Sequence, residues 1–189
     1  MQKRNMKKDT VQIKINFLII LFLFSSNAFA QAKFGAGGYI GGGVISGNTP
    51  NQSAFTSSVF FDFKTPFSDN IVPRFSFFYA QDFNRLLPGT TNKYYPFLKG
   101  FSLKGVASQS ISQNYFAEEG IGFITLNDRT FSDIDEWNFG VVSSLLIGFD
   151  LRNNLLTGWK IGAGMEFAFS FANTFAKYYS FHVQGEYLF

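Results

Sequence analysis

The sequence predicts an all-β fold, namely a transmembrane antiparallel up-and-down β-barrel of eight strands. Three observations lead to this prediction. Long segments alternate between apolar and polar residues, 20% of the residues are aromatic, and a secretion signal occupies the N-terminus. After that signal, no run of about 18 apolar residues is present that could form a membrane helix. The aromatic residues are therefore expected in strands.

The first 30 residues have the parts of a secretory signal peptide. Five basic residues between Lys3 and Lys14 precede the apolar run Phe17 to Phe24, and the small-residue pattern Ala28-Phe29-Ala30 follows. The apolar run is too short to span a bilayer as a helix, and the pattern after it is a cleavage site. We expect residues 1–30 to be removed and residues 31–189 to form the barrel domain.

Removal of the signal changes the charge of the chain. The signal contains five of the 16 Lys and Arg residues and one of the 13 acidic residues, which leaves 11 basic and 12 acidic residues. The basic pI of the whole chain therefore reflects the signal, and no nucleic-acid surface is predicted. The chain has no cysteine, which excludes disulfides and the acylated cysteine of a lipoprotein.

The alternation is clearest in the C-terminal third. From Trp159 to Phe171 every second residue is apolar, and the residues between them are small or polar. The final segment, up to Phe189, repeats this pattern. Because successive side chains of a strand point to opposite faces, each segment presents one apolar face.

A soluble β-sandwich would also show alternation and is the alternative fold. The segments here exceed ten residues, which is long enough to cross a bilayer at a tilt, whereas sandwich strands usually have about five or six. Phe, Tyr and Trp crowd the apolar face, as in the aromatic girdles of membrane barrels. The polar face carries charges of both signs and many glycines, which is typical of a narrow lumen. These features favour the membrane barrel.

Eight such segments follow one another along the chain. The connections 47–54, 86–95 and 128–136 are long, whereas 68–70, 111–113 and 153–154 are tight; 172–176 is shorter than the other long connections. Short turns on one side and longer loops on the other are expected of membrane barrels. The predicted strands are about 33–46, 55–67, 71–85, 96–110, 114–127, 137–152, 155–171 and 177–189.

The chain resembles the small eight-stranded outer-membrane proteins of the OmpA and OmpX type. It ends as they do, with the terminal aromatic Phe189 after Phe181, Val183 and Tyr187 in alternation. In that group the ending is recognised by the barrel assembly machinery. The resemblance implies a location in the cell outer membrane and contact with its lipid and lipopolysaccharide.

Alternation also assigns charged residues to the lumen. The interior of an eight-stranded barrel is just wide enough to be filled by side chains, and an unpaired buried charge is strongly destabilising. We therefore expect paired acids and bases to plug the lumen, with a narrow small-solute pore as the alternative. The residues predicted to face inward include Asp62, Lys64, Arg74, Asp82, Lys104, Glu118, Asp150, Lys160, Glu166, His182 and Glu186.

No catalytic site is predicted, and a lipid A-modifying enzyme is the alternative. The segment 115–122 is loosely similar to a strand of the lipid A deacylases, a resemblance that implies a His followed two residues later by a Ser on the lipid-facing side. Here the order is reversed, and Ser180 and His182 are both predicted to face inward. A Ser-His-acid set would combine them with Glu166 or Glu186. We expect His182 to be structural instead, as an imidazolium beside Glu186.

No cofactor or metal is predicted either. His182 is the one histidine, and the acidic residues Asp133, Asp135 and Glu136 lack the spacing of an EF-hand. The predicted role is therefore structural or one of surface interaction, with the outer loops as the candidate contact surface for a ligand. The most aromatic loop is the best candidate, with membership of its tyrosines in the outer aromatic girdle as the alternative; it contains Asn92, Lys93, Tyr94, Tyr95, Pro96 and Phe97.

Glycines are concentrated in the first predicted strand. They lack the spacing G-x-G-x-x-G and no helix follows them, so no nucleotide-binding loop is predicted. We expect them to ease curvature where the first strand closes against the last. They are Gly35, Gly37, Gly38, Gly41, Gly42 and Gly43.

Overall fold

Eight antiparallel strands form a closed barrel in the computed structural model, which describes residues 33–64, 71–86, 94–133, 135–152, 157–173 and 175–189. Each strand pairs with its neighbours along the chain, and β1 pairs with β8. The predicted eight-stranded all-β barrel is confirmed. The predicted signal peptide, residues 1–30, lies outside the described residues.

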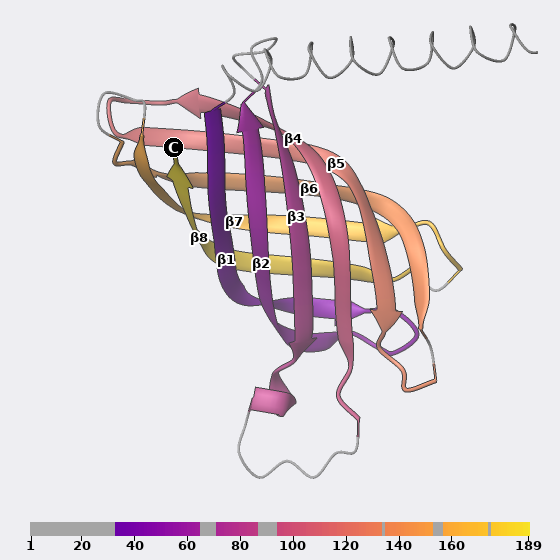
Figure 1. Cartoon of the computed structure of the whole chain (residues 1–189). Helices are drawn as coiled ribbons and strands as arrows, with labels where there is room; N and C mark the ends of the chain where they lie inside the picture. The colour runs from indigo at the N-terminus through magenta and orange to yellow at the C-terminus, as the bar shows by residue number, and fades with distance from the viewer. Residues whose placement is uncertain (1–32, 65–70, 87–93, 134, 153–156, 174) are drawn as a thin grey trace, which may run out of the picture.

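The strands follow the chain around the barrel in sequence order (Figure 1). One short 3-10 helix, η1, lies at Phe83–Leu86. The strands are β1 (Lys33–Ser46), β2 (Gln52–Lys64), β3 (Ile71–Asp82), β4 (Phe97–Ser110), β5 (Tyr115–Arg129), β6 (Glu136–Asp150), β7 (Gly158–Ser170) and β8 (Lys177–Leu188). Among the described residues, no helix is long and apolar enough to cross a membrane.

Among the described residues, two predicted strand boundaries were wrong by three residues, and the predicted ends of β5 and β6 were wrong by two. β2 begins at Gln52 and not at residue 55, which shortens the first loop. Residues 83–85, predicted as the end of the third strand, lie in η1. The backbone N–H of Asn84 donates to Oδ1 of Asp82 at 2.8 Å, and this local turn ends the strand. The predicted second strand ends with residues 65–67 and the predicted seventh strand begins with residues 155–156. Both segments lie outside the described residues.

The stagger of the strands sets the width of the barrel. Following paired residues once around the sheet from Ile71 leads back to β3 at Gln81, ten residues further along. With strands about 4.8 Å apart and a rise of about 3.3 Å per residue, this stagger tilts the strands by about 40° and gives a Cα radius of about 8 Å. Such a lumen holds side chains and little else.

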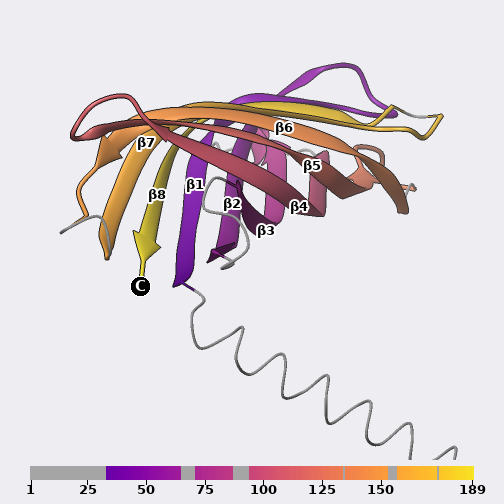
Figure 2. The same cartoon turned by 90° about the horizontal axis from the view of Figure 1, so that it is seen from above.

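The two ends of the barrel differ. The C-terminus and the connections β2–β3, β4–β5 and β6–β7 lie at one end, here called the turn end, and the connections β1–β2, β3–β4, β5–β6 and β7–β8 lie at the other, the loop end (Figure 1). By the strand bounds, the connection between β3 and β4 has 14 residues and the others have four to seven, so the predicted alternation of long and tight connections holds for that one connection only. Two views place the C-terminus beside the start of β1 (Figures 1 and 2). The backbone N–H of Phe189 donates to the carbonyl of Phe34 at 2.9 Å, which fastens the terminal residue to β1.

The outer surface of the barrel is apolar and aromatic. Every second strand residue points away from the lumen, and large apolar side chains at these positions are exposed. Aromatic contacts form a girdle near the turn end, where the ring centroids of Tyr115 and Phe149 lie 4.9 Å apart and those of Trp159 and Tyr187 lie 5.2 Å apart. Phe97, Trp137 and Phe171 lie near the loop end. This arrangement is typical of a barrel in a bilayer.

Two inward glycines of β1 allow it to close against β8. A Cβ atom at Gly41 would overlap the carbonyl oxygen of Phe181, and one at Gly43 would overlap the carbonyl oxygen of Tyr179. At Gly42, which points outward, the nearest atom to an added Cβ is a ring carbon of Phe83 at 3.4 Å. The close approach is therefore required on the lumen side of the seam.

We predict that Gly43→Ala destabilises the closed barrel by about 1–3 kcal/mol, because the added methyl group must displace the β8 backbone. Gly42→Ala, one residue away on the same strand, should leave the barrel unchanged. The measurement is the fraction that migrates as folded barrel on unboiled gels during a urea titration. Coincident titrations of the two variants would contradict the steric role of Gly43.

Candidate functional site

The lumen is filled by three layers of side chains, and the layer nearest the turn end is a cluster of charges. Nε and Nη2 of Arg74 donate to both carboxylate oxygens of Asp62 at 2.7 and 2.8 Å. Nη2 also lies 3.2 Å from Glu118 and 3.4 Å from Glu186. Nζ of Lys160 donates to Glu118 at 2.9 Å. These five residues, the turn-end cluster, come from five different strands and are all buried.

A small vestibule lies between the turn-end cluster and the turn end. Its volume is about 220 Å³, and Lys64 and Arg152 contribute to its lining. Arg152 pairs with Asp150, with Nη2 2.5 Å from Oδ2. Arg74 and Lys160 of the cluster, together with Lys64, match its three carboxylates in number, and Arg152 is matched by Asp150. The predicted inward direction and mutual pairing are confirmed for the five residues of the turn-end cluster.

The middle layer is centred on Glu166 of β7. The side chain of Lys104 forms a buried ion pair with it. The hydroxyls of Tyr39 and Tyr178 both donate to its Oε1, at 2.8 and 2.6 Å. The carboxylate thus has one cation and two hydroxyl donors. A buried charge requires such pairing and hydrogen bonding to offset the loss of its hydration. The sequence did not assign Tyr39 and Tyr178 to this site, although their phase on β1 and β8 places both in the lumen.

His182 lies in the same layer and contacts neutral groups. Its ring stacks on Tyr39 with centroids 3.9 Å apart, and its Nδ1 lies 3.3 Å from Oγ of Ser180. Ser180 Oγ lies 2.7 Å from the hydroxyl of Thr56. The expectation that Glu186 would pair with His182 was wrong, because Glu186 is drawn to Arg74 in the turn-end cluster.

Between the middle layer and the loop end lies an apolar layer, which the alternation of charges did not predict. Phe78 and Tyr178 stack with ring centroids 3.7 Å apart. Side chains of Ile45, Leu98 and Leu126, each buried, pack in the same cluster. Asp128 and Asp82, the latter predicted to face inward, lie one inward position closer to the loop end than Leu126 and Ala80 and are also buried. The apolar layer therefore lies between the middle layer and buried acidic residues at the loop end.

Solved structures of two bacterial surface proteins have a similar fold. Neisserial surface protein A matches with a TM-score of 0.61 and 6% identity over 82% of this chain and 97% of that chain. Ail, the attachment invasion locus protein of Yersinia pestis, solved in complex with the heparin analogue sucrose octasulfate, matches with a TM-score of 0.50 and 10% identity over 84% and 97%. The chain has the fold of the eight-stranded outer-membrane barrels. No family model and no curated protein matches the sequence.

In an outer-membrane barrel the loop end faces the exterior of the cell and the turn end faces the periplasm. At the extracellular rim, Asn127 donates to Oδ1 of Asp135 at 2.8 Å and Nη1 of Arg129 lies 2.6 Å from Oδ2. The Asn127 amide, together with Arg129, lowers the pKa of the Asp135 carboxyl. Asp135 is thus already paired within the rim. Within the described part of the chain, no group of three acidic, His or Cys side chains is placed to hold a metal ion.

The aromatic loop between β3 and β4 is hydrogen-bonded to the connection between β5 and β6. The hydroxyl of Tyr94 donates to the backbone carbonyls of Arg129 and Phe131, at 2.5 and 3.2 Å. Asn92 and Lys93, which belong to the same predicted contact surface, lie outside the described residues. Tyr94 therefore holds two extracellular loops together and does not project from them.

The four candidate catalytic residues do not form a relay. Ser180 and His182 are adjacent, but the described contacts of Glu166 go to Lys104, Tyr39 and Tyr178, and those of Glu186 go to Arg74. Neither carboxylate orients the imidazole. Ser180 is 0% exposed and His182 7% exposed, both on the lumen side. The deacylase resemblance would need them on the lipid-facing side, so the geometry supports a packing role.

We predict that Lys104→Met destabilises the barrel by about 3–5 kcal/mol, because it leaves the Glu166 carboxylate buried without its cation. Lys177→Met removes a lysine that is exposed at the extracellular end of β8 and should have an effect within about 0.5 kcal/mol. Urea titration of both variants in the same lipid measures the difference. A Lys104→Met barrel as stable as the Lys177→Met barrel would show that the ion pair does not stabilise the lumen.

Proposed function

We propose that this chain is a non-enzymatic integral barrel of the cell outer membrane, which blocks its own lumen and presents its extracellular loops to a partner. The observation that carries the proposal is the filled lumen: a charged layer, a hydrogen-bonded layer and an apolar layer lie one above another. A barrel built in this way offers no site for a substrate and no route for a solute. Its outer rim is then the surface available for function.

Export and membrane assembly are parts of the same proposal. Residues 1–30 serve as the signal peptide, and the segment ending in Phe189 serves as the recognition sequence for the assembly machinery. The apolar outer face supports insertion into lipid, where the strands have no free edge because β1 pairs with β8.

We predict that the barrel does not conduct ions in planar bilayers. The ion pairs of Arg74 and Lys104 and the apolar layer leave no continuous aqueous path, and the desolvation of a passing ion there is strongly unfavourable. Single-channel recording at neutral pH, with a large porin as the positive control, provides the measurement. Discrete and repeated conductance steps from the folded barrel would replace the proposal with that of a narrow pore.

The extracellular rim displays aromatic side chains that the barrel does not need. Phe131 and Phe175 lie in loops at the rim and are 52% and 61% exposed. Phe175 has a φ of 43°, in the left-handed region that is unfavourable for a bulky residue. An exposed Phe in that conformation supports a binding role for it, because strained residues cluster at functional sites. Binding residues concentrate on loops that a rigid scaffold positions, and here the closed barrel is that scaffold.

The chemistry of this rim fits an apolar or aromatic contact with a protein. Ail was solved with a sulfated heparin analogue, but such a polyanion requires free cations. Here Arg129 pairs with Asp135, and Nη1 of Arg85 donates to the hydroxyl of Tyr79 at 3.3 Å. The exposed Lys177 of β8 supplies one positive charge, whereas a polyanion is bound by several. Aromatic residues are enriched at protein contact surfaces, where they contribute much of the binding energy.

We predict that cells displaying the protein adhere to a panel of immobilised extracellular proteins, and that Phe131→Ser combined with Phe175→Gly reduces adhesion by about tenfold or more. Gly relieves the left-handed strain, so the variant barrel should be no less stable. Because the contact is apolar, high salt should not abolish it. Wild-type adhesion to heparin that disappears in high salt would contradict the proposed partner chemistry.

A further inference from the structure

Glu119 of β5 is a carboxylate that faces the membrane. Alternation along β5 directs Glu118 into the lumen, where it is 4% exposed, and leaves Glu119 exposed on the outer face. Lys99, another outward charged residue, lies 5.9 Å from the ring centroid of Trp137 in the extracellular girdle. Of the described outward residues between the two girdles, Glu119 is the charged one.

The position of Glu119 lies well inside the apolar band. It is four residues from Tyr115 of the periplasmic girdle, which at the strand tilt corresponds to about 10 Å toward the bilayer centre. Its neighbours Ile121 and Leu145 are 73% and 51% exposed, as expected for lipid contact. The described residues supply no hydrogen bond or ion pair to its carboxylate. Ionisable groups at such positions are unfavourable unless something pairs with them.

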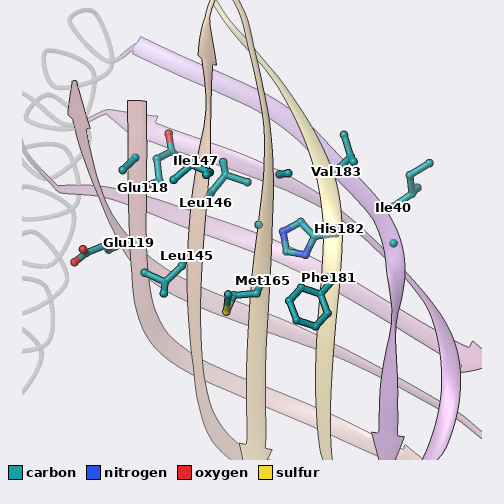
Figure 3. Close-up of a pocket in the computed structure, with 14 residues that line it drawn as sticks. Ile40, Glu118, Glu119, Leu145, Leu146, Ile147, Met165, Phe181, His182 and Val183 are labelled. Carbon is teal, nitrogen blue, oxygen red and sulfur yellow. The ribbon is translucent and has the colours of Figure 1, made fainter. Parts of the chain in front are cut away.

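Glu119 stands at one end of an open groove on the outer face. The groove has a volume of about 750 Å³ and an apolar lining. The small side chains of Ala117 and Ala163 line one part of the groove, and Met165 and Phe181 line it further from Glu119. Figure 3 shows Glu119 at one end of the groove and Ile40 at the other.

The groove climbs through the periplasmic half of the bilayer. Glu119 pairs with Leu145, Leu145 with Met165, and Met165 with Phe181. Because the strands are tilted, each step along such a row rises by about 3 Å toward the extracellular side. The groove therefore leads from the depth of Glu119 to the middle of the bilayer, which is the course of an acyl chain in the periplasmic leaflet.

We propose that Glu119 and this groove bind one phospholipid that carries a primary amine in its headgroup. The carboxylate pairs with the ammonium group, and one acyl chain lies in the groove. Ala107, which pairs with Glu119, and Ala117 are small, so the carboxylate has room to extend toward the headgroups. This inference rests on the membrane location proposed above.

Charge complementarity favours a lipid over a second copy of the chain. A second barrel placed on this face would bring another Glu119 and, from the described residues of the band, no cation to pair with it. An amine headgroup supplies that cation. In a medium of low dielectric constant an ion pair is stronger than in water, so the pairing offsets the unfavourable position of Glu119.

The test uses barrels reconstituted in equal amounts of phosphatidylethanolamine and phosphatidylglycerol, extracted gently and weighed by native mass spectrometry. The wild type should retain phosphatidylethanolamine over phosphatidylglycerol by at least about threefold, Glu119→Gln should bring the ratio close to one, and Glu119→Lys should invert it. Ala163→Phe, which fills the groove, should lower retention of both lipids.

Matched controls are Glu136→Gln, a carboxylate exposed at the extracellular start of β6, and Thr125→Phe, an added ring on the outer face away from the groove. Both should retain lipid as the wild type does. Equal retention of the two lipids by the wild type, or an unchanged ratio in Glu119→Gln, would overturn the site. A dimer mass that depends on Glu119 would assign the groove to a second copy. Failure to insert into vesicles would instead contradict the membrane location.

Discussion

Closure of the sheet between β1 and β8, with a stagger of ten residues, is the constraint on which the rest of the structure depends. Stagger and strand number together set the tilt and the radius. At a radius of about 8 Å, inward side chains from opposite walls meet, so every inward polar group must find a partner among them. The glycines Gly41 and Gly43 make this closure sterically feasible.

Filling of the lumen by ion pairs has a further consequence. A buried pair adds little net stability over apolar packing, but breaking one is costly. Arg74 contacts carboxylates from β2, β5 and β8. If one strand shifted its register by one residue, several buried charges would therefore lose their partners at once. The charged layers therefore select one register. The apolar layer lies above them, toward the extracellular end.

The outer face of the barrel must be apolar, whereas the lumen must pair its polar groups. The outward side chains contact lipid, which favours apolar residues between aromatic girdles and disfavours charge. Glu119 departs from that rule beside a groove of small residues, and Phe175 departs from ordinary backbone preference at the rim. Both departures lie where the barrel meets other molecules, whereas the lumen residues Ser180 and His182 are committed to packing. Positions that the fold does not require are the ones most available for function.

Alternation with a period of two was enough to determine which residues face inward, since it depends on each strand alone. It correctly placed Asp62, Arg74, Glu118 and Glu166 in the lumen and yielded the number of strands. It did not determine their partners. Arg74 meets Glu186, 112 residues away, because the stagger brings their strands to the same level around a closed barrel. The relative height of the strands is decided only by the tertiary structure. The same height places Glu186 away from His182 and forms the groove beside Glu119.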